Sequence, residues 1–197
     1  RNLDVVHTLL LSTSVLDVMR DGEGVQMGLW EHSLATARAA AALAEVVGVP
    51  NPEELGVAGL LHDVGKLALQ ERCPEECAEV RRQVASRRCL PAAAERAVLG
   101  ATHADVGGWL LAKWQLPEKL RLPVAQHHAV DPGAPHAMRA AIVHVADVLV
   151  RGAATAGHDE GFVPPLDPRA WHLLGLTTKH IEDVLRILDA THDEEHL

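Results

Sequence analysis

Gly59-Leu60-Leu61-His62-Asp63-Val64-Gly65-Lys66 places a histidine and an aspartate side by side at the end of an apolar run. Imidazole and carboxylate groups are common ligands of divalent metal ions, and two consecutive residues at the end of a helix can both reach one ion. Two ligands do not make a site, so this pair predicts further ligands elsewhere in the chain. The rest of the sequence is expected to be scaffold or to supply those ligands.

Helix signals surround this stretch on both sides. Before it, Asn51-Pro52-Glu53-Glu54 combines an expected N-cap, a proline at the first helical position and acidic residues in the first turn. After it, Gly65 is expected to end or bend the helix. The chain has no tyrosine, one phenylalanine and little alternation of polar and apolar residues, so we predict an all-α protein. The predicted helices cover about residues 3–19, 27–47, 52–63, 67–71, 74–88, 91–99, 102–114, 117–128, 138–150, 168–174 and 178–190.

The composition is that of a globular domain in water. With 197 residues, 48% of them hydrophobic and 23% charged, the chain is expected to form one domain over residues 1–197. Apolar runs free of charge are too short to cross a bilayer, so we predict no membrane association. A net charge of −9 without a basic cluster disfavours binding to duplex nucleic acid. Three cysteines, an odd number, predict a reducing, cytoplasmic location.

Asp147 is the most informative residue after the opening pair. Residues 140–150 are apolar nearly all round, which predicts a buried helix. A carboxylate buried there costs several kcal/mol unless it is paired, hydrogen-bonded or bound to a metal ion. Its partner is either His144, an arginine from another helix, or a metal ion, and the metal ion is the interpretation that we favour.

Histidines near the ends of predicted helices supply the other candidate ligands. His32 and His103 lie near helix starts, and His127 and His128 lie at a helix end. Each alone is more typical of an exposed or hydrogen-bonded side chain, and adjacent side chains point in different directions, so only one of the last two is expected to face the site. Together they match the way in which helical bundles gather metal ligands from several helices. The other histidines, His144 among them, are interpreted as structural or solvated.

Taken in order, these residues resemble the HD superfamily of metal-dependent phosphohydrolases. The His, His, Asp, Asp pattern of that superfamily is similar to His32, His62, Asp63 and Asp147. The additional His103, His127 and His128 resemble the extra histidines of binuclear members such as the HD-GYP phosphodiesterases. Over about residues 26–151 the chain is most similar to the HDOD group, above all at residues 29–35, 58–67, 103–107 and 114–117.

The resemblance implies an HD-type helical bundle with a binuclear metal site in its core. Asp63 would bridge two ions, with His32, His62 and Asp147 on one ion and His103 with His127 or His128 on the other. The ions would be Fe, Mn, Ni, Zn or Mg, although imidazole-rich ligation disfavours Mg as a tight occupant. Asp63 and Lys66 would be catalytic, with Lys66 contacting a phosphate oxygen. The substrate would be a small phosphate-containing molecule, such as a nucleotide or a cyclic dinucleotide.

The sequence also departs from these relatives. After His128 it lacks the Gly-Tyr-Pro signature that is associated with cyclic di-GMP hydrolysis. The helical portion that precedes this region in HDOD proteins is expected to be missing before Arg1. Many HDOD members lack catalytic ligands and act as signalling modules, whereas this chain has the full set. We therefore expect a metal-dependent phosphohydrolase or phosphodiesterase. The alternatives are a signalling module with a structural or vestigial metal site and a protein partner, and an HD-fold di-iron oxygenase.

Overall fold

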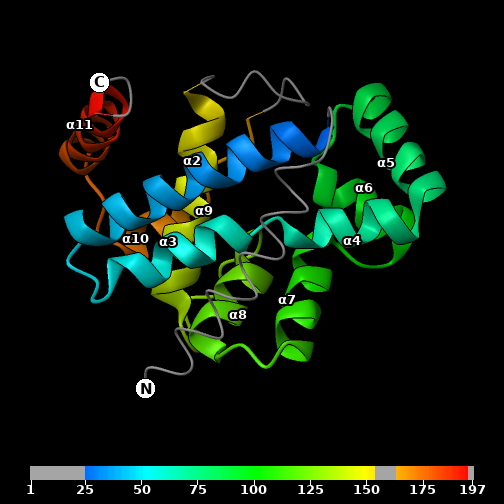
Figure 1. Cartoon of the computed structure of the whole chain (residues 1–197), viewed down its shortest axis with the longest axis horizontal. Coiled ribbons are helices and arrows are strands. Elements are labelled where there is room, and N and C mark those ends of the chain that lie inside the picture. The colour runs from blue at the N-terminus through cyan, green and yellow to red at the C-terminus, as the bar shows by residue number, and fades with distance from the viewer. Residues whose placement is uncertain (1–24, 154–162, 195–197) are drawn as a thin grey trace.

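The computed structural model describes the backbone of residues 25–153 and 163–194, and the side chains of residues 28–153 and 163–188. Within these ranges the chain forms α-helices and no strand, which confirms the all-α prediction (Figure 1). The helix predicted over residues 3–19 lies outside the described residues, as does much of the connection over 152–166. Among the described helices, none combines the length and the apolar character that a membrane crossing needs. The helices are α2 (Val25–Val46), α3 (Pro52–Leu61), α4 (Val64–Arg72), α5 (Pro74–Arg87), α6 (Pro91–Leu99), α7 (His103–Lys113), α8 (Glu118–Gln126), α9 (Ala137–Gly152), α10 (Pro168–Leu173) and α11 (Thr178–Glu194).

The centre of the bundle is the antiparallel pair α2 and α3, against which α9 packs (Figure 1). Small residues allow the pair to approach closely, because a Cβ at Gly59 would lie 2.8 Å from the backbone oxygen of Thr36. The largest apolar cluster joins α2, α3 and α9 through buried Leu43, Leu55 and Ile142, and α10 and α11 pack on the same cluster. This cluster holds α9, with its nearly continuous apolar surface, in the interior, as its sequence predicts.

A second apolar cluster supports the His62-Asp63 pair. It contains Leu61 and Val64, the residues on either side of the pair, together with Leu111 of α7 and Val124 of α8. Because both flanking side chains are buried in this cluster, the backbone of the pair is anchored on both sides. The pair therefore has a defined position between α3 and α4.

The structure corrects the prediction for Gly65. The helix breaks at the His62-Asp63 pair, since α3 ends before it and α4 begins after it, and Gly65 lies inside α4. The glycine serves close packing, because a Cβ there would lie 2.7 Å from the backbone nitrogen of Gly107 in α7 and even closer to the carbonyl oxygen of His103. Without a side chain at this position, α4 and α7 touch, and His103 is brought next to Asp63.

The helix starts are capped differently from one another. Asn51 precedes α3 as predicted, but it adopts a left-handed φ of 57° and its side chain makes no capping hydrogen bond, so that part of the prediction is wrong. Asp167 caps α10 by accepting a hydrogen bond from the backbone N–H of Arg169. Thr102 and Asp105 form a reciprocal capping box at the start of α7, which fixes the turn that precedes His103.

We expect Gly65→Ala to lower the free energy of unfolding by about 3 kcal/mol or more, because the added methyl group forces apart two backbones that have no flexible atoms to yield. Gly56→Ala in α3 is the matched control, since its Cβ would meet its neighbours at 3.4 and 3.6 Å, an ordinary contact. Urea denaturation followed by circular dichroism measures both. Equal stability of the two variants would contradict the close approach of α4 and α7.

Candidate metal centre

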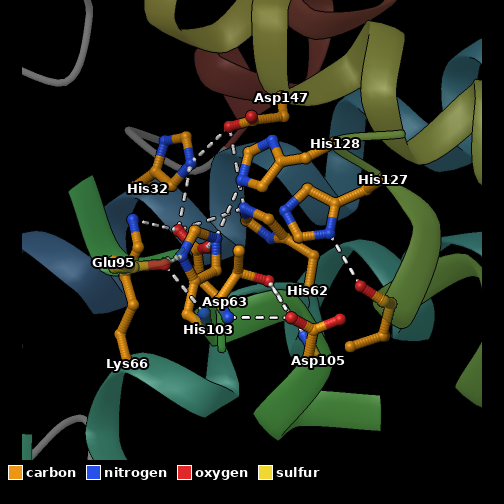
Figure 2. Close-up of polar contacts among 12 residues, drawn as sticks. His32, His62, Asp63, Lys66, Glu95, His103, Asp105, His127, His128 and Asp147 are labelled. Atoms are coloured by element: carbon orange, nitrogen blue, oxygen red, sulfur yellow. Dashed lines mark hydrogen bonds and ion pairs between the residues drawn. The ribbon is translucent and has the colours of Figure 1, made fainter. Parts of the chain in front are cut away.

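The seven predicted ligands lie together in the interior of the bundle (Figure 2). His62 and Asp63 are at its centre, and both are fully buried, with 0% of their surface exposed. The surrounding residues come from α2, α7, the end of α8, and α9. They are His32, His103, His127, His128 and Asp147.

Two of the buried rings are oriented by the ends of their own helices. His62 and His127 each follow the last residue of a helix, and each Nδ1–H donates to the carbonyl oxygen three residues earlier. The distances are 2.6 Å to Gly59 and 2.7 Å to Val124. Carbonyl groups in the last turn of a helix lack intrahelical donors, which makes them available to these rings. When Nε2 carries no proton, each ring presents the lone pair of this nitrogen to the interior, which is the orientation of a metal-binding histidine.

His103 is oriented by Glu95 of α6, a residue that the sequence analysis did not single out. The buried Glu95 carboxylate accepts hydrogen bonds from the backbone N–H of His103 at 2.8 Å and from its Nδ1 at 2.7 Å. Burial raises the pKa of Glu95, but the hydrogen bonds from His103 outweigh it and the pKa is lowered. Nε2 of His103 then lies 3.1 Å from Oδ1 of Asp63. Glu95 is the one acid of α6, a helix that begins with three alanines after its proline, and this was the available signal.

One group of ligand atoms gathers around Asp147. Nε2 of His32 lies 2.9 Å from Oδ1 of Asp147, and Nε2 of His62 lies 3.6 Å from the same oxygen. Both rings also face Asp63, whose Oδ2 lies 3.2 Å from Nε2 of His62 and 3.8 Å from Nε2 of His32. The four side chains form a compact set of two imidazoles and two carboxylates.

A second group contains three imidazoles. Ligand atoms of His103, His127 and His128 all lie within 4.8 Å of one another, and Nε2 of His128 is 2.8 Å from Nε2 of His103. Both members of the adjacent pair therefore face the cluster, whereas the sequence suggested that only one would. Ligand atoms of His62, Asp63 and His127 also lie within 4.8 Å of one another, which links the two groups.

Among the described residues, four buried polar atoms of this cluster make no well-formed hydrogen bond, although Nε2 of His62 and Oδ1 of Asp63 each have an ion-pair contact, at 3.2 and 3.1 Å. The four atoms are Nε2 of His62, Oδ1 of Asp63, Nε2 of His127 and Oδ2 of Asp147. An unmet buried polar atom costs about 1–3 kcal/mol, so native structures rarely keep several side by side without a reason. Imidazole nitrogens and carboxylate oxygens that converge in this way suit divalent transition metals. The residues therefore fit a bound metal ion in each group.

The charges of the cluster also favour a cation. Burial raises the pKa values of Asp63 and Asp147, but the neighbouring histidines and basic side chains hold both well below their usual range. Burial lowers the pKa of His62, but the two carboxylates outweigh it and raise that pKa to about 9. Burial and the charges of His62 and His103 lower the pKa of His127 to about 3. The carboxylates are thus ionised at neutral pH, and positive charge beside them is strongly favoured.

Two basic side chains reach the same carboxylates. Nζ of Lys66 lies 2.9 Å from Oδ2 of Asp63. Arg151, which the sequence analysis did not single out, donates from Nε to Oδ1 of Asp147 at 2.8 Å and from its guanidinium to Oδ2 of Asp63 at 3.5 Å. The arginine beside Asp147 therefore comes from the same helix, one turn later, and not from another helix. The spacing of four residues within a predicted helix was the signal for this pair.

His144 does not pair with Asp147, although the sequence allowed that pairing. Its Nδ1–H donates to the backbone oxygen of His127 at 2.8 Å, and its Nε2 accepts from the backbone N–H of Asp167 at 2.9 Å. The ring thus connects the end of α8 to the segment before α10. Its contacts hold the backbone beside the cluster in place.

A cavity of about 310 Å³ adjoins the cluster. His103 and His128, together with Lys66 and Arg151, line the part of the cavity that meets the cluster. The remaining walls are His144, residues 90–92 at the start of α6, and residues 164–168, which lead into α10. A small molecule in this cavity would therefore contact the proposed ligands and both basic side chains.

The fold and the cluster together define an all-α domain with buried histidines and aspartates beside a small cavity. The HDOD domain family matches residues 3–130 of the chain. A crystal structure of an HDOD domain protein with unknown function from Geobacter sulfurreducens is 27% identical, with a TM-score of 0.71 over 97% of this chain and 68% of that chain. The MmoQ response regulator from Methylococcus capsulatus is 25% identical, with a TM-score of 0.59 over 82% of this chain and 60% of that one.

An uncharacterized protein of Treponema pallidum (strain Nichols) is 26% identical over 142 residues, which are 72% of this chain. The chain covers 28% of the length of that relative. The family match extends over more than half of the present chain, and the structural match covers nearly all of it. The chain therefore belongs to the HDOD domain family, as the sequence resemblance indicated.

We expect Glu95→Gln to weaken metal binding by about 10–100-fold, because the neutral amide holds the His103 ring and its Nε2 lone pair less firmly. Glu79→Gln is the matched control, since that exposed glutamate of α5 pairs with Arg82 on the surface. Isothermal titration of Mn²⁺ or Zn²⁺ into the metal-free protein measures both affinities. An unchanged affinity in Glu95→Gln would show that His103 does not need this carboxylate or is not a ligand.

Proposed function

We propose that this chain is a metal-dependent phosphohydrolase with two divalent ions. His32, His62, Asp63 and Asp147 would hold one ion, and His103, His127 and His128, again with Asp63, would hold the other. Asp63 would serve both because it lies between both groups of ligand atoms, 3.2 Å from His62 and 3.1 Å from His103. The substrate is a small phosphate ester.

The observation that carries this proposal is the set of buried ligand atoms that make no well-formed hydrogen bond. Nitrogen and oxygen atoms of His62, Asp63, His127 and Asp147 converge without such a bond to any described residue, and they belong to both groups. A purely structural cluster would be expected to satisfy these atoms internally. Their position next to a cavity with two basic side chains supports a role with an anionic ligand.

The roles of the side chains are derived from their positions. When bound, two divalent ions would supply an activated water and would neutralise negative charge on the phosphate. Lys66 and Arg151 contact phosphate oxygens, and the buried walls around His62 and His127 keep bulk water away. In the overall hydrolysis the oxygen of water forms the new bond to phosphorus and the bond from phosphorus to the ester oxygen breaks. A proton of that water ends on the released alcohol.

A signalling module is the second candidate function. The structural likeness to the MmoQ response regulator supports it, because that protein is named as a regulator and shares the fold. In such a module the same residues would bind a metal ion for stability, and the cavity would hold a regulatory ligand. Catalytic turnover distinguishes the two functions, since both predict metal binding.

We expect the chain to bind two metal ions, and Asp63→Asn to retain fewer than one, because the amide cannot bridge. Elemental analysis of protein purified without chelator measures the stoichiometry, and thermal unfolding with and without chelator measures the stabilisation by bound metal. Asp183→Asn on the surface of α11 is the control, since its partners are Lys179 and Arg186. Less than one equivalent in the unaltered protein would overturn the binuclear site.

We expect hydrolysis of aryl phosphates when Mn²⁺ or Fe²⁺ is supplied, and a loss of more than about 100-fold in Asp63→Asn. Lys66→Gln is expected to lower kcat/KM by about 10–100-fold with an unchanged metal content, because it removes a charged phosphate contact. Lys179→Gln on α11 serves as its control.

The measurement is a panel of aryl phosphates, nucleotides and cyclic dinucleotides with each metal. Absence of turnover across the panel would favour the signalling module. Activity that survives in Asp63→Asn would show that the site lies elsewhere.

A further inference from the structure

The cavity beside the cluster has two chemically different parts. Lys66 and Arg151 line the cavity, and their side chains are 26% and 18% exposed. Both can therefore contact a bound ligand directly, whereas Asp63 is fully buried. Away from the cluster the walls are mostly apolar, with Leu90 and Leu166 on opposite segments. The cavity therefore matches a ligand with one strongly anionic end and one apolar end.

Proline residues determine what the apolar part can recognise. Pro91 lies on one wall, and Pro164, Pro165 and Pro168 lie on the other. A proline has no backbone N–H and a fixed φ, so these walls are rigid and offer few backbone hydrogen-bond donors, and Asp167 is the one polar side chain within residues 90–92 and 164–168. A nucleobase is recognised through hydrogen bonds to its polar edge, which these walls do not favour. A compact aromatic or aliphatic group suits them better.

The volume limits the ligand further. Binding cavities for small molecules span roughly 300–1,000 Å³, and the present one, at about 310 Å³, is at the lower end. Such a space accommodates a phosphate and one ring-sized group. It is small for the two bases and two sugars of a cyclic dinucleotide, most of which would lie outside it.

The anionic end is also specified by charge. A phosphate monoester carries up to two negative charges, whereas a diester carries one. The planar guanidinium of Arg151 can pair with two phosphate oxygens at once, and the ammonium group of Lys66 acts as a point charge. Two basic side chains beside two proposed metal ions favour the more highly charged monoester.

We propose that this cavity binds a phosphate monoester that carries one compact apolar group, held between residues 90–92 and 164–168. This assignment rests on the proposed phosphohydrolase function, which places the phosphate at the end of the cavity that adjoins the metal ligands. It adds Leu90 and Leu166 as residues that determine specificity through apolar contact with the leaving group.

Leu90→Ser tests the apolar wall with little risk to folding. Leu90 occupies the N-cap position of α6 with an extended backbone, φ −63° and ψ 139°, where serine is preferred to leucine. We expect the dissociation constant and the KM for phenyl phosphate to rise about tenfold, with kcat at saturation unchanged. The values for glycerol 3-phosphate, which has a polar group, are expected to stay the same. Leu185→Ser is the control, because that exposed leucine lies on α11 and does not line the cavity.

Binding is measured by calorimetry on the Mn²⁺-loaded full chain, and hydrolysis is measured separately. Tighter binding of phenyl phosphate than of glycerol 3-phosphate, AMP and inorganic phosphate, together with its loss in Leu90→Ser, supports the inference. If this pattern appears without turnover, the cavity assignment stands and the proposed hydrolysis is overturned. Turnover that is equal for phenyl and glycerol phosphates, is unaffected by Leu90→Ser, or is fastest for a cyclic dinucleotide overturns the cavity assignment and leaves the hydrolase.

Discussion

The structure depends on how the buried carboxylate of Asp63 is matched by positive charge. Its oxygens face His62 at 3.2 Å, His103 at 3.1 Å and Lys66 at 2.9 Å, with the guanidinium of Arg151 slightly farther away. An isolated carboxylate in this position would cost several kcal/mol, so the helices that carry those groups must meet at this point. Burial of apolar side chains stabilises the bundle. The requirement that this buried carboxylate be paired with positive charge limits which helices can pack around it.

Close backbone contact is what allows the helices to meet there. Gly65 permits α4 to touch α7, and Gly59 permits α3 to touch α2. The first contact places His103 beside Asp63, and the second keeps Nε2 of His32 3.8 Å from Oδ2 of Asp63. Packing and chemistry are therefore coupled, because a methyl group that separates two helices also separates two candidate ligands.

Much of this arrangement could be predicted from the sequence, for reasons that differ between residues. Prolines at helix starts and Gly100 at a helix end are local signals, and the helices lie close to where those signals place them. The helix break was predicted at Gly65, but it lies at His62-Asp63. A glycine in a helical stretch has the same local sequence signal whether it ends the helix or allows another helix to pack closely against it. Glu95 was missed because its role exists only once α6 packs near His103. The cavity joins segments about 75 residues apart, and no local pattern encodes it.

His103 and His128 connect the two halves of the proposed function, since they belong to a candidate ligand group and also line the cavity. A molecule that binds in the cavity would contact these rings directly, whether or not a bond is then broken. The hydrolase and the signalling module thus share one binding place and differ in whether the bound molecule is cleaved.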